Sequence, residues 1–288
     1  MTPVPPRPET GADLHTHTTA SDGTVTPEER VRMAREAGLA AVGVTDHDTL
    51  DGLPAARRAA AEAGLELVPG VELSAEVEVG GRRVDVHVLG YWVDEGDAPL
   101  MELLAERRRA RERRLARILA RLESGCGIVL DEARVRAIAG RGAVGRPHVA
   151  RALVEQGVVS TVAEAFERFL APGRPGYVPR EPLPPARAFA AIREAGGVPV
   201  LAHPGLMPSA AWQLLPAWKD QGLLGIEVRH SQHTEAQVET FLRWAEDLGL
   251  VPTGGSDCHG PSPGQPALIG QVRIPLDWLD RLRELRRP

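Results

Sequence analysis

Two histidines stand two positions apart in the stretch ADLHTHTTASDG (residues 12–23), and an aspartate follows five residues after the second. In an extended segment, residues two apart project to the same side, so His15 and His17 can reach one metal ion together. Asp22 adds a carboxylate for that ion or for a neighbouring one. A single histidine at a strand end is more often a hydrogen-bonded structural residue, so this motif needs partners elsewhere in the chain to indicate a metal site.

Residues of the same chemical types recur in or directly after later apolar runs. They are Asp46 and His47 in VTDHD, Glu72 in PGVEL, His87 in VDVHVLGYW, His203 in LAHPG, and Asp257 and His259 in GGSDCHG. The carboxyl ends of parallel strands form the face on which α/β barrels build their active sites. Imidazole and carboxylate ligands suit zinc, manganese or iron better than calcium or magnesium, which prefer all-oxygen shells. The candidates outnumber the ligands that one ion needs, so we expect two or three divalent ions (Mn, Zn or Fe) that share a bridging carboxylate.

The elements that must position these residues alternate between strand and helix. GADLH, AVGVT, LELVPGVEL and VDVHVLGYW predict the first strands, and GGVPVLAHPG, LLGIEV and LVPTGGSD predict the later ones. Thr26, followed by Pro27 and Glu29, predicts a capped helix start. Gly38 and Gly64 are placed to end the first two helices. The strand–helix repeat predicts a parallel sheet with helices outside it.

This rhythm breaks in the middle of the chain, which becomes mostly helical with loops rich in glycine and proline. We interpret residues 98–190 as an inserted helical subdomain between two parts of one barrel, residues 12–97 and 191–288. The N-terminal segment carries four prolines and lacks the apolar run of a signal peptide. It predicts a disordered leader over residues 1–11.

Composition and charge limit the classes of protein. The chain of 288 residues has 43% hydrophobic and 25% charged residues, which is ordinary for a globular enzyme. Its formal charge of −5 argues against a general nucleic-acid coat protein. The only two cysteines, Cys126 and Cys258, give no disulfide framework, so we expect a cytoplasmic protein. No stretch of about 18 uncharged apolar residues predicts a transmembrane helix, and we expect no membrane partner.

Six motifs occur in the order of one known family. DLHTHTTASDG, GVTDHDTLDG, PGVELSAE, HVLGYW, LAHPG and GGSDCHG closely resemble the PHP superfamily (polymerase and histidinol phosphatase domains) of metal-dependent phosphoesterases, over residues 12 to 270. The resemblance implies a distorted (β/α)7 barrel that holds three metal ions. It implies a first ion on His15, His17, Glu72 and Asp257, a second that shares Glu72 and adds His87 and His203, and a third on Asp22, His47 and His259.

The insertion narrows this resemblance to one branch. GRPHVARALVEQG, YVPRE and GIEV with the nearby His233 resemble the branch that hydrolyses nucleoside 3′,5′-bisphosphates, of which some members trim RNA or short oligonucleotides from the 5′ end. It implies that a metal-activated hydroxide attacks phosphorus of a pAp-like substrate, which leaves the 5′-monophosphate. Two alternatives stay open: another phosphomonoesterase such as histidinol phosphatase, and a PHP module that holds metal without turnover. The native metals and the oligomeric state also stay open.

Several residues are candidates for contacts with the substrate. Arg146 and Arg180 can grip a second phosphate because a guanidinium presents a planar fork to phosphate oxygens, although Arg146 also suits a solvated helix start. His148 is a candidate contact to phosphate or nucleotide. His233 is a candidate to protonate the leaving alkoxide or touch the scissile phosphate, with a solvent-facing helix start as the alternative. With His233, the ligands Asp257 and His203 complete the predicted catalytic set.

The remaining polar features carry weaker signals. Residues 101–121 hold eight arginines and three glutamates, which indicates a solvated helix face or a basic rim that steers nucleotide or RNA ends. Asp48 and Asp51 are expected to order the loop after His47, and Cys258 is expected to be packed and not metal-bound. No role is assigned to three residues at the end of one predicted strand: Glu227, Arg229 and His230.

Overall fold

The computed structural model describes residues 10–140, 142–261 and 267–286; the predicted leader lies almost entirely outside them. Seven strands form one sheet in chain order. They are β1 (Ala12–Asp13), β2 (Ala41–Val44), β3 (Glu66–Val79), β4 (Arg82–Tyr91), β5 (Val198–Leu201), β6 (Gly225–His230) and β7 (Val251–Gly255). The amide of Leu14 donates to the carbonyl oxygen of Gly254 at 3.1 Å, and the amide of Asp257 donates to that of His15 at 2.9 Å. The chain after β7 thus meets the chain after β1, so the sheet curls into the nearly closed barrel that the sequence predicted.

One strand departs from the predicted parallel sheet. β4 runs antiparallel to both β3 and β5, whereas the other neighbouring pairs are parallel. Gly80 and Gly81 alone connect β3 to β4, with φ of +57° and +73°. A two-residue turn of this left-handed kind can only join antiparallel strands. As a result Glu72 lies in the middle of β3 and not at its end, and His87 lies within β4 opposite Ser74.

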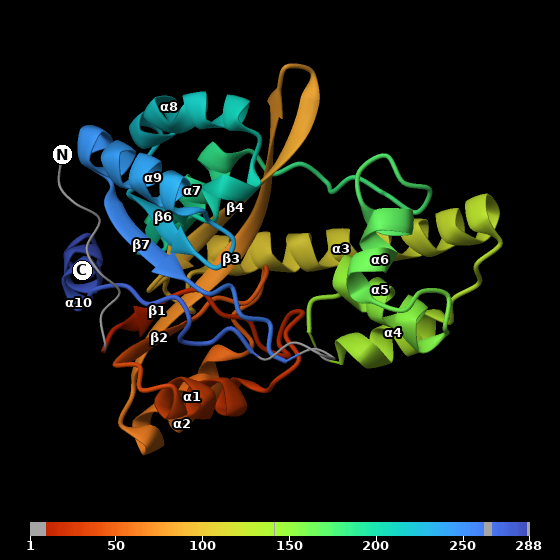
Figure 1. Ribbon diagram of the computed structural model, residues 1–288, viewed down its shortest axis with the longest axis horizontal. Coiled ribbons are helices and arrows are strands. Elements are labelled where there is room, and N and C mark those ends of the chain that lie inside the picture. Colours follow the sequence, from red (N-terminus) through yellow and green to blue (C-terminus); the bar gives the residue numbers. More distant parts are fainter. Residues whose placement is uncertain (1–9, 141, 262–266, 287–288) are drawn as a thin grey trace.

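Helices cover the outside of the barrel (Figure 1). They are α1 (Pro27–Glu36), α2 (Leu53–Ala63), α7 (Pro185–Glu194), α8 (Leu215–Asp220), α9 (Glu235–Leu248) and α10 (Leu276–Glu284), with 3-10 turns η2 (Pro204–Leu206) and η3 (Ser209–Leu214). The predicted capping box is confirmed, because Thr26 and Glu29 each accept the backbone N–H of the other. Gly64 ends α2 in a left-handed conformation, as predicted.

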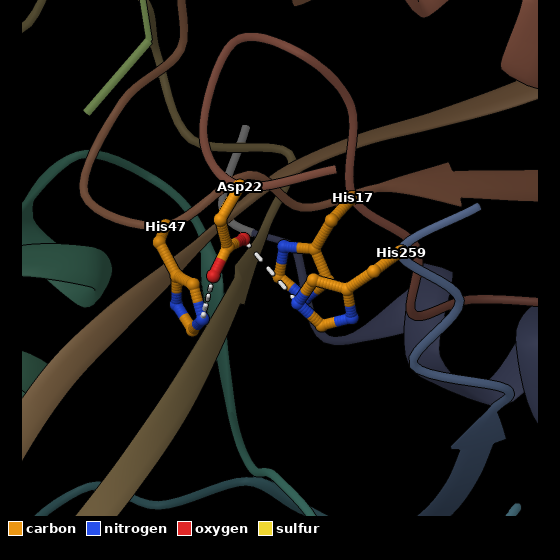
Figure 2. A group of neighbouring side chains, drawn as sticks. All are labelled: His17, Asp22, His47 and His259. Carbon is orange, nitrogen blue, oxygen red and sulfur yellow. Dashed lines mark ion pairs between the residues drawn. The ribbon is translucent and has the colours of Figure 1, made fainter. Parts of the chain in front are cut away.

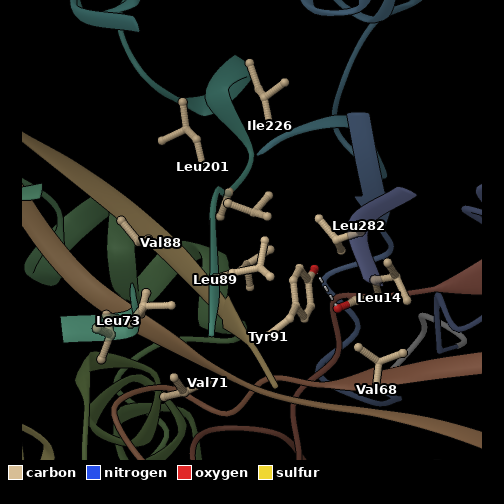
Figure 3. Close-up of a cluster of buried hydrophobic side chains, with 14 of the residues drawn as sticks. Leu14, Val68, Val71, Leu73, Val88, Leu89, Tyr91, Leu201, Ile226 and Leu282 are labelled. Carbon is tan, nitrogen blue, oxygen red and sulfur yellow. Dashed lines mark hydrogen bonds between the residues drawn. The ribbon is translucent and has the colours of Figure 1, made fainter. Parts of the chain in front are cut away.

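The core of the barrel is built from valine, leucine and alanine, with few aromatic side chains. Leu14, Val68, Leu73 and Ile226 are fully buried within it (Figure 3). Tyr91 is fully buried in this core, and its hydroxyl donates to the carbonyl oxygen of Leu14 at 3.1 Å. This bond holds the chain just before the first predicted metal ligand.

The inserted helices project from one side of the barrel around the far half of α3 (Figure 1). They are α3 (Ala98–Cys126), α4 (Glu132–Ala139), α5 (Arg146–Glu155), α6 (Val162–Ala165) and the π-helical turn η1 (Phe166–Leu170). Buried side chains from Leu115 to Val178 form a second hydrophobic cluster there. By contrast, Phe189 and Ile192 of α7 belong to the barrel core. We therefore propose that the insertion ends before Pro185 instead of at residue 190. No described helix is both long and apolar enough to cross a bilayer.

Candidate metal centre

The structure brings all nine predicted metal ligands together at one end of the barrel. Three groups have ligand atoms within 4.8 Å of one another: His17, Asp22, His47 and His259 (Figure 2); His15, His17 and Asp257; and His47, Glu72 and His87. The ninth, His203, has its Nε2 3.2 Å from Oε1 of Glu72 and 3.2 Å from Nδ1 of His87. The grouping differs from the one implied by the family resemblance, because His17 also stands in the Asp22 group and His47 also stands beside Glu72.

The loop after β1 is shaped by a carboxylate that is not itself in these groups. Asp46 accepts the amide and the hydroxyl of Thr18, each at 2.7 Å, and the hydroxyl of Ser21 at 2.6 Å. These bonds turn the chain back so that Oδ1 of Asp22 lies 3.2 Å from Nε2 of His259. Asp46 thus orients a ligand and is fully engaged in doing so.

A fully buried arginine joins the loops after β1 and β7. The Arg30 guanidinium donates to the carbonyl oxygens of His17 and Cys258, both at 3.0 Å, and to Sγ of Cys258 at 3.0 Å. Cys258 is packed, as predicted, and its sulfur points to Arg30. The arginine therefore fixes the backbone beside His17, Asp257 and His259 without contacting their side chains.

Glu227, for which no role was predicted, holds two of the predicted ligands. Its two carboxylate oxygens lie 3.2 Å from Nδ1 of His15, and Oε2 accepts the amide of His203 at 2.7 Å. A carboxylate on the far nitrogen of a metal-binding histidine is the usual outer partner, because it fixes the ring and its tautomer. It leaves Nε2 of His15 directed at the cluster, 3.4 Å from Glu72 and 3.5 Å from Asp257. The place of Glu227 in the buried strand GIEV was the sequence signal that could have indicated this role.

The electrostatics of the cluster favour a cation. Burial opposes the charged form of His17, but the carboxylates of Asp257 and Glu72 outweigh burial and raise its pKa to about 10. Burial likewise raises the pKa of Asp257, yet His15 and His259 bring it well below its ordinary value. Ligand carboxylates and imidazoles share protons in this way when no other cation is near them, and a divalent ion can replace those protons.

Several ligand atoms are buried without a hydrogen bond. Among the described residues, no acceptor or donor with hydrogen-bond geometry meets Nδ1 of His17, Nδ1 of His47, Oε2 of Glu72 or Nδ1 of His203. Buried polar atoms without such partners are rare in folded proteins. Nε2 of His15 and Nε2 of His17 also face each other at 3.2 Å, with Oδ1 of Asp257 3.0 Å from the second. This donor set fits divalent ions that prefer imidazole and carboxylate.

The predicted substrate arginines lie beside this cluster. Nη1 of Arg180 is 2.8 Å from Nε2 of His87, on the far side of that ring from Glu72. Arg146 lies further out, where its guanidinium stacks on Phe166 and Tyr177 and approaches Asp85 at 3.4 Å. Burial, with some help from Arg180, lowers the pKa of His87 to about 4, so its ring is in the neutral form that binds metal.

The other two predicted substrate contacts have backbone partners. Nδ1 of His233 faces the carbonyl oxygen of Val228 at 2.9 Å, and its Nε2 accepts the amide of Gly205 at 3.1 Å. Nδ1 of His148 accepts the amide of Gly145 at 2.9 Å, and the ring lies beside the backbone of Ser21. Burial lowers the pKa of each ring to about 4. These contacts favour a structural role for both histidines over a direct contact to substrate.

Sequence reasoning missed His230, which lies against the ligands. Its side chain is fully buried, and Nε2 lies 3.5 Å from Oδ2 of Asp257. Nδ1 accepts the amide of Gln232 at 3.1 Å, so the ring proton belongs on Nε2, where no hydrogen-bond acceptor of good geometry occurs among the described residues. His230 ends the buried strand β6, and His47 follows β2 by three residues. The position at a strand end was the sequence signal that could have indicated His230.

Comparisons with known proteins agree with this geometry. Residues 13–129 match the family model described as PHP domain. The chain is 37% identical to the 5′-3′ exoribonuclease Rnm of Salmonella typhimurium (87% of this chain, 86% of that protein). It is 33% identical to the 3′,5′-nucleoside bisphosphate phosphatase of Chromobacterium violaceum (88% of both). A crystal structure described as a metal-dependent phosphoesterase of Bifidobacterium adolescentis superposes with a TM-score of 0.88 at 33% identity, over 98% of this chain and 99% of that one.

Proposed function

This chain belongs to the PHP domain family and is a metal-dependent phosphoesterase, and we propose that it removes one phosphate from nucleoside 3′,5′-bisphosphates. The product is the nucleoside 5′-monophosphate. Its relatives bear the names of hydrolases, which disfavours a module that holds metal without turnover. We also place the protein in the cytoplasm, since both cysteines are free thiols.

The observation that carries this proposal is a surplus of buried arginines beside the metal centre. A small pocket between α3 and β3 is lined by four arginines and two acidic residues, so the arginines are in excess: Arg107, Arg111, Arg114 and Arg180 with Asp48 and Glu181. Arg107 and Arg114 are only 7% and 9% exposed. Within the described residues, no carboxylate lies at ion-pair distance from Arg114 or Arg180, and Arg114 donates only to the carbonyl oxygen of Val178. Buried guanidinium groups are costly without a counter-charge, so an anion is expected here.

A second phosphate on the substrate meets that expectation. The Arg180 guanidinium touches the outer face of His87, and His87 touches Glu72, so the arginine pocket and the metal ligands are neighbours. A molecule with two phosphates on one ribose can place one in each. Histidinol phosphate has a single phosphate and would leave the arginines without an anion, which favours the bisphosphate over that alternative.

The roles of the residues follow from their places. Divalent ions held by the nine ligands would lower the pKa of a bound water and offset charge on the phosphoryl group. Arg146 and Arg180, joined by Arg114, hold the second phosphate and so fix the position of the first. Asp257 and His203 act at the reacting phosphate as ligands. For His233 we propose support of the loop that carries His203, because it hydrogen-bonds Gly205.

Short RNA with a 5′ phosphate is a second candidate substrate. One of the relatives is named a 5′-3′ exoribonuclease, and α3 carries an exposed row of arginines outward from the pocket. Arg113 pairs with Glu181 and Arg121 binds the carbonyl oxygen of Pro175, whereas Arg117 is exposed. One side of α3 is therefore a solvated face, and its other side lines the buried arginine pocket.

Replacement of a pocket arginine tests the bisphosphate proposal. Arg114→Met should reduce kcat/KM for adenosine 3′,5′-bisphosphate by 10-fold or more, because charge-assisted bonds to phosphate contribute about 1.5–3 kcal/mol each. Turnover of adenosine 3′-monophosphate, which lacks the second phosphate, should change little. Arg113→Met, on the exposed side of the same helix, is the matched control. An equal loss on both substrates would reject the second-phosphate site.

A further inference from the structure

Two barrel loops supply Asp22 and His47 to the metal group drawn in Figure 2. We name them the first metal loop (residues 16–25, after β1) and the second metal loop (residues 45–52, after β2). Each of them is held by side chains that come from the insertion, which follows much later in the chain. These contacts are hydrogen bonds and an ion pair, like those that hold the loops within the barrel itself.

The first metal loop is held by one face of α5. Arg151 donates from Nη2 to the carbonyl oxygen of Asp22, the residue whose carboxylate faces the metal group. His148, one turn earlier on that face, lies beside the backbone of the neighbouring Ser21. Both histidine and arginine are therefore directed at the backbone of the loop and not at open space.

The segment before α5 packs on the same loop. The amide of Ala143 donates to the carbonyl oxygen of Ala20 at 3.0 Å. Gly142 lies so close to the loop that a Cβ atom there would stand 2.7 Å from the carbonyl oxygens of Ser21 and Thr19. With Arg151, this places two loop residues, Ala20 and the predicted ligand Asp22, in hydrogen bonds with the insertion, and Gly142 packs against Ser21 between them.

The second metal loop is held by α3. Asp48 directly follows the ligand His47 and has a φ of +53°, a left-handed value that costs energy for a residue other than glycine. Its carboxylate accepts Nε and Nη2 of Arg111 at 2.8 and 2.6 Å, and also the amide of Ser74 at 3.0 Å. Both guanidinium nitrogens meet the same oxygen, Oδ2, in an ion pair that is nearly buried and stabilises the strained backbone beside His47.

We infer that Arg151 and Arg111 position the metal ligands Asp22 and His47, so that the insertion is a working part of the metal centre. Metal ligands need outer partners that hold them within a few tenths of an ångström, and here two of those partners lie outside the barrel. The inference rests on the proposed metal centre. It also gives His148 a place in the support of the first metal loop.

A competing effect makes the test decisive. A guanidinium so close to a metal group also repels a cation, and Asp22 is the charge that acts most on Arg151. If repulsion were the main effect, loss of the arginine would strengthen metal binding. If positioning is the main effect, loss of the arginine weakens it, so the two effects predict opposite signs.

The experiment is a competition titration of Mn²⁺ against a chelator, with bound manganese counted by mass spectrometry. Arg151→Gln should bind one of its ions about 10- to 100-fold more weakly than the unmodified chain, with the remaining ions held as before. Arg151→Lys keeps the charge but loses the guanidinium fork, so it should show a smaller loss of the same ion. Arg134→Gln, an exposed insertion arginine that pairs with Glu155, is the matched control and should change nothing.

Binding by Arg151→Gln that is as tight as in the unmodified chain, or tighter, overturns the inference. If that variant does not fold by circular dichroism, Arg151→Lys and Arg111→Lys decide instead, and unchanged binding in both overturns it equally. An unmodified chain that binds no Mn²⁺ rejects the proposed metal centre itself, and the inference with it. Intact binding by the unmodified chain with selective loss in the variants supports both.

Discussion

At the residue scale, the gathering of the candidate ligands was predictable because their chemistry is rare and repeated. Six of the nine histidines occur in short motifs in or directly after apolar runs, and each motif strengthens the others. Glu227 and His230 were missed because each belongs to a strand, GIEVRH, without a second ligand type at a telling spacing. Only the fold shows that they face His15 and Asp257. The substrate contacts of His148 and His233 stay predictions, since a histidine pattern does not reveal which backbone atoms its ring nitrogens meet.

Glu227→Gln tests the outer partner of the cluster. The substitution keeps the shape of the side chain but removes the negative charge that lies beside Nδ1 of His15, so Mn²⁺ affinity should fall about 10- to 100-fold. Chelator competition measures the affinity, and Glu239→Gln, an exposed change on α9, serves as the control. Affinity unchanged from that of the control would show that the Glu227 contact does not tune the metal centre.

At the element scale, local sequence patterns predicted which segments form strands and helices, but not the direction of every strand. The capping box at Thr26 and the left-handed Gly64 were correct because each depends on neighbouring residues alone. The parallel prediction for β4 was wrong because alternation of apolar runs does not encode direction. The pair Gly80–Gly81 carried that information, since a connection of two residues cannot cross over to a parallel strand.

The close approach of β2 to the chain after β1 predicts sensitivity at Gly43. A Cβ atom there would lie 2.2 Å from the carbonyl oxygen of Leu14, which is backbone and cannot swing away. Gly43→Ala should lower the free energy of unfolding by about 1–3 kcal/mol or more, as overpacking does. Urea denaturation measures the change. Gly125 lies within α3, and a Cβ atom there would meet nothing closer than the side chain of Pro175 at 3.9 Å. Gly125→Ala should therefore be neutral or slightly stabilising. Equal effects at both positions would contradict a close approach between Gly43 and Leu14.

At the scale of the whole molecule, the sequence predicted a barrel with a helical insertion but not how the two cooperate. The break in the strand–helix alternation marks the insertion, and the second hydrophobic cluster gives it a core of its own. Contacts such as Arg111 with Asp48 join residues far apart in the chain. No spacing rule links such pairs, so the arginine pocket and the support of the metal loops appear only in three dimensions.

Removal of metal should destabilise the molecule as a whole. Ions that bind the folded state and not the unfolded chain add RT ln(1 + [L]/Kd), about 2.7 kcal/mol at 100 times Kd. A chain of this size should then lose about 5–10 °C in Tm on treatment with EDTA, and added Mn²⁺ should restore it. Differential scanning calorimetry measures the shift. A Tm that is the same with EDTA and with Mn²⁺ would indicate that the buried cluster does not bind the ion.

The most direct test of the central claim is phosphate release from adenosine 3′,5′-bisphosphate by the Mn²⁺-loaded protein. Asp257→Asn is the blank, because asparagine tolerates the φ of +53° at this position while it removes a ligand carboxylate. We predict release of the 3′-phosphate with adenosine 5′-monophosphate left behind, and no release by Asp257→Asn. No release by metal-loaded protein, or equal release by the blank, would contradict a bisphosphate phosphatase centred on these ligands.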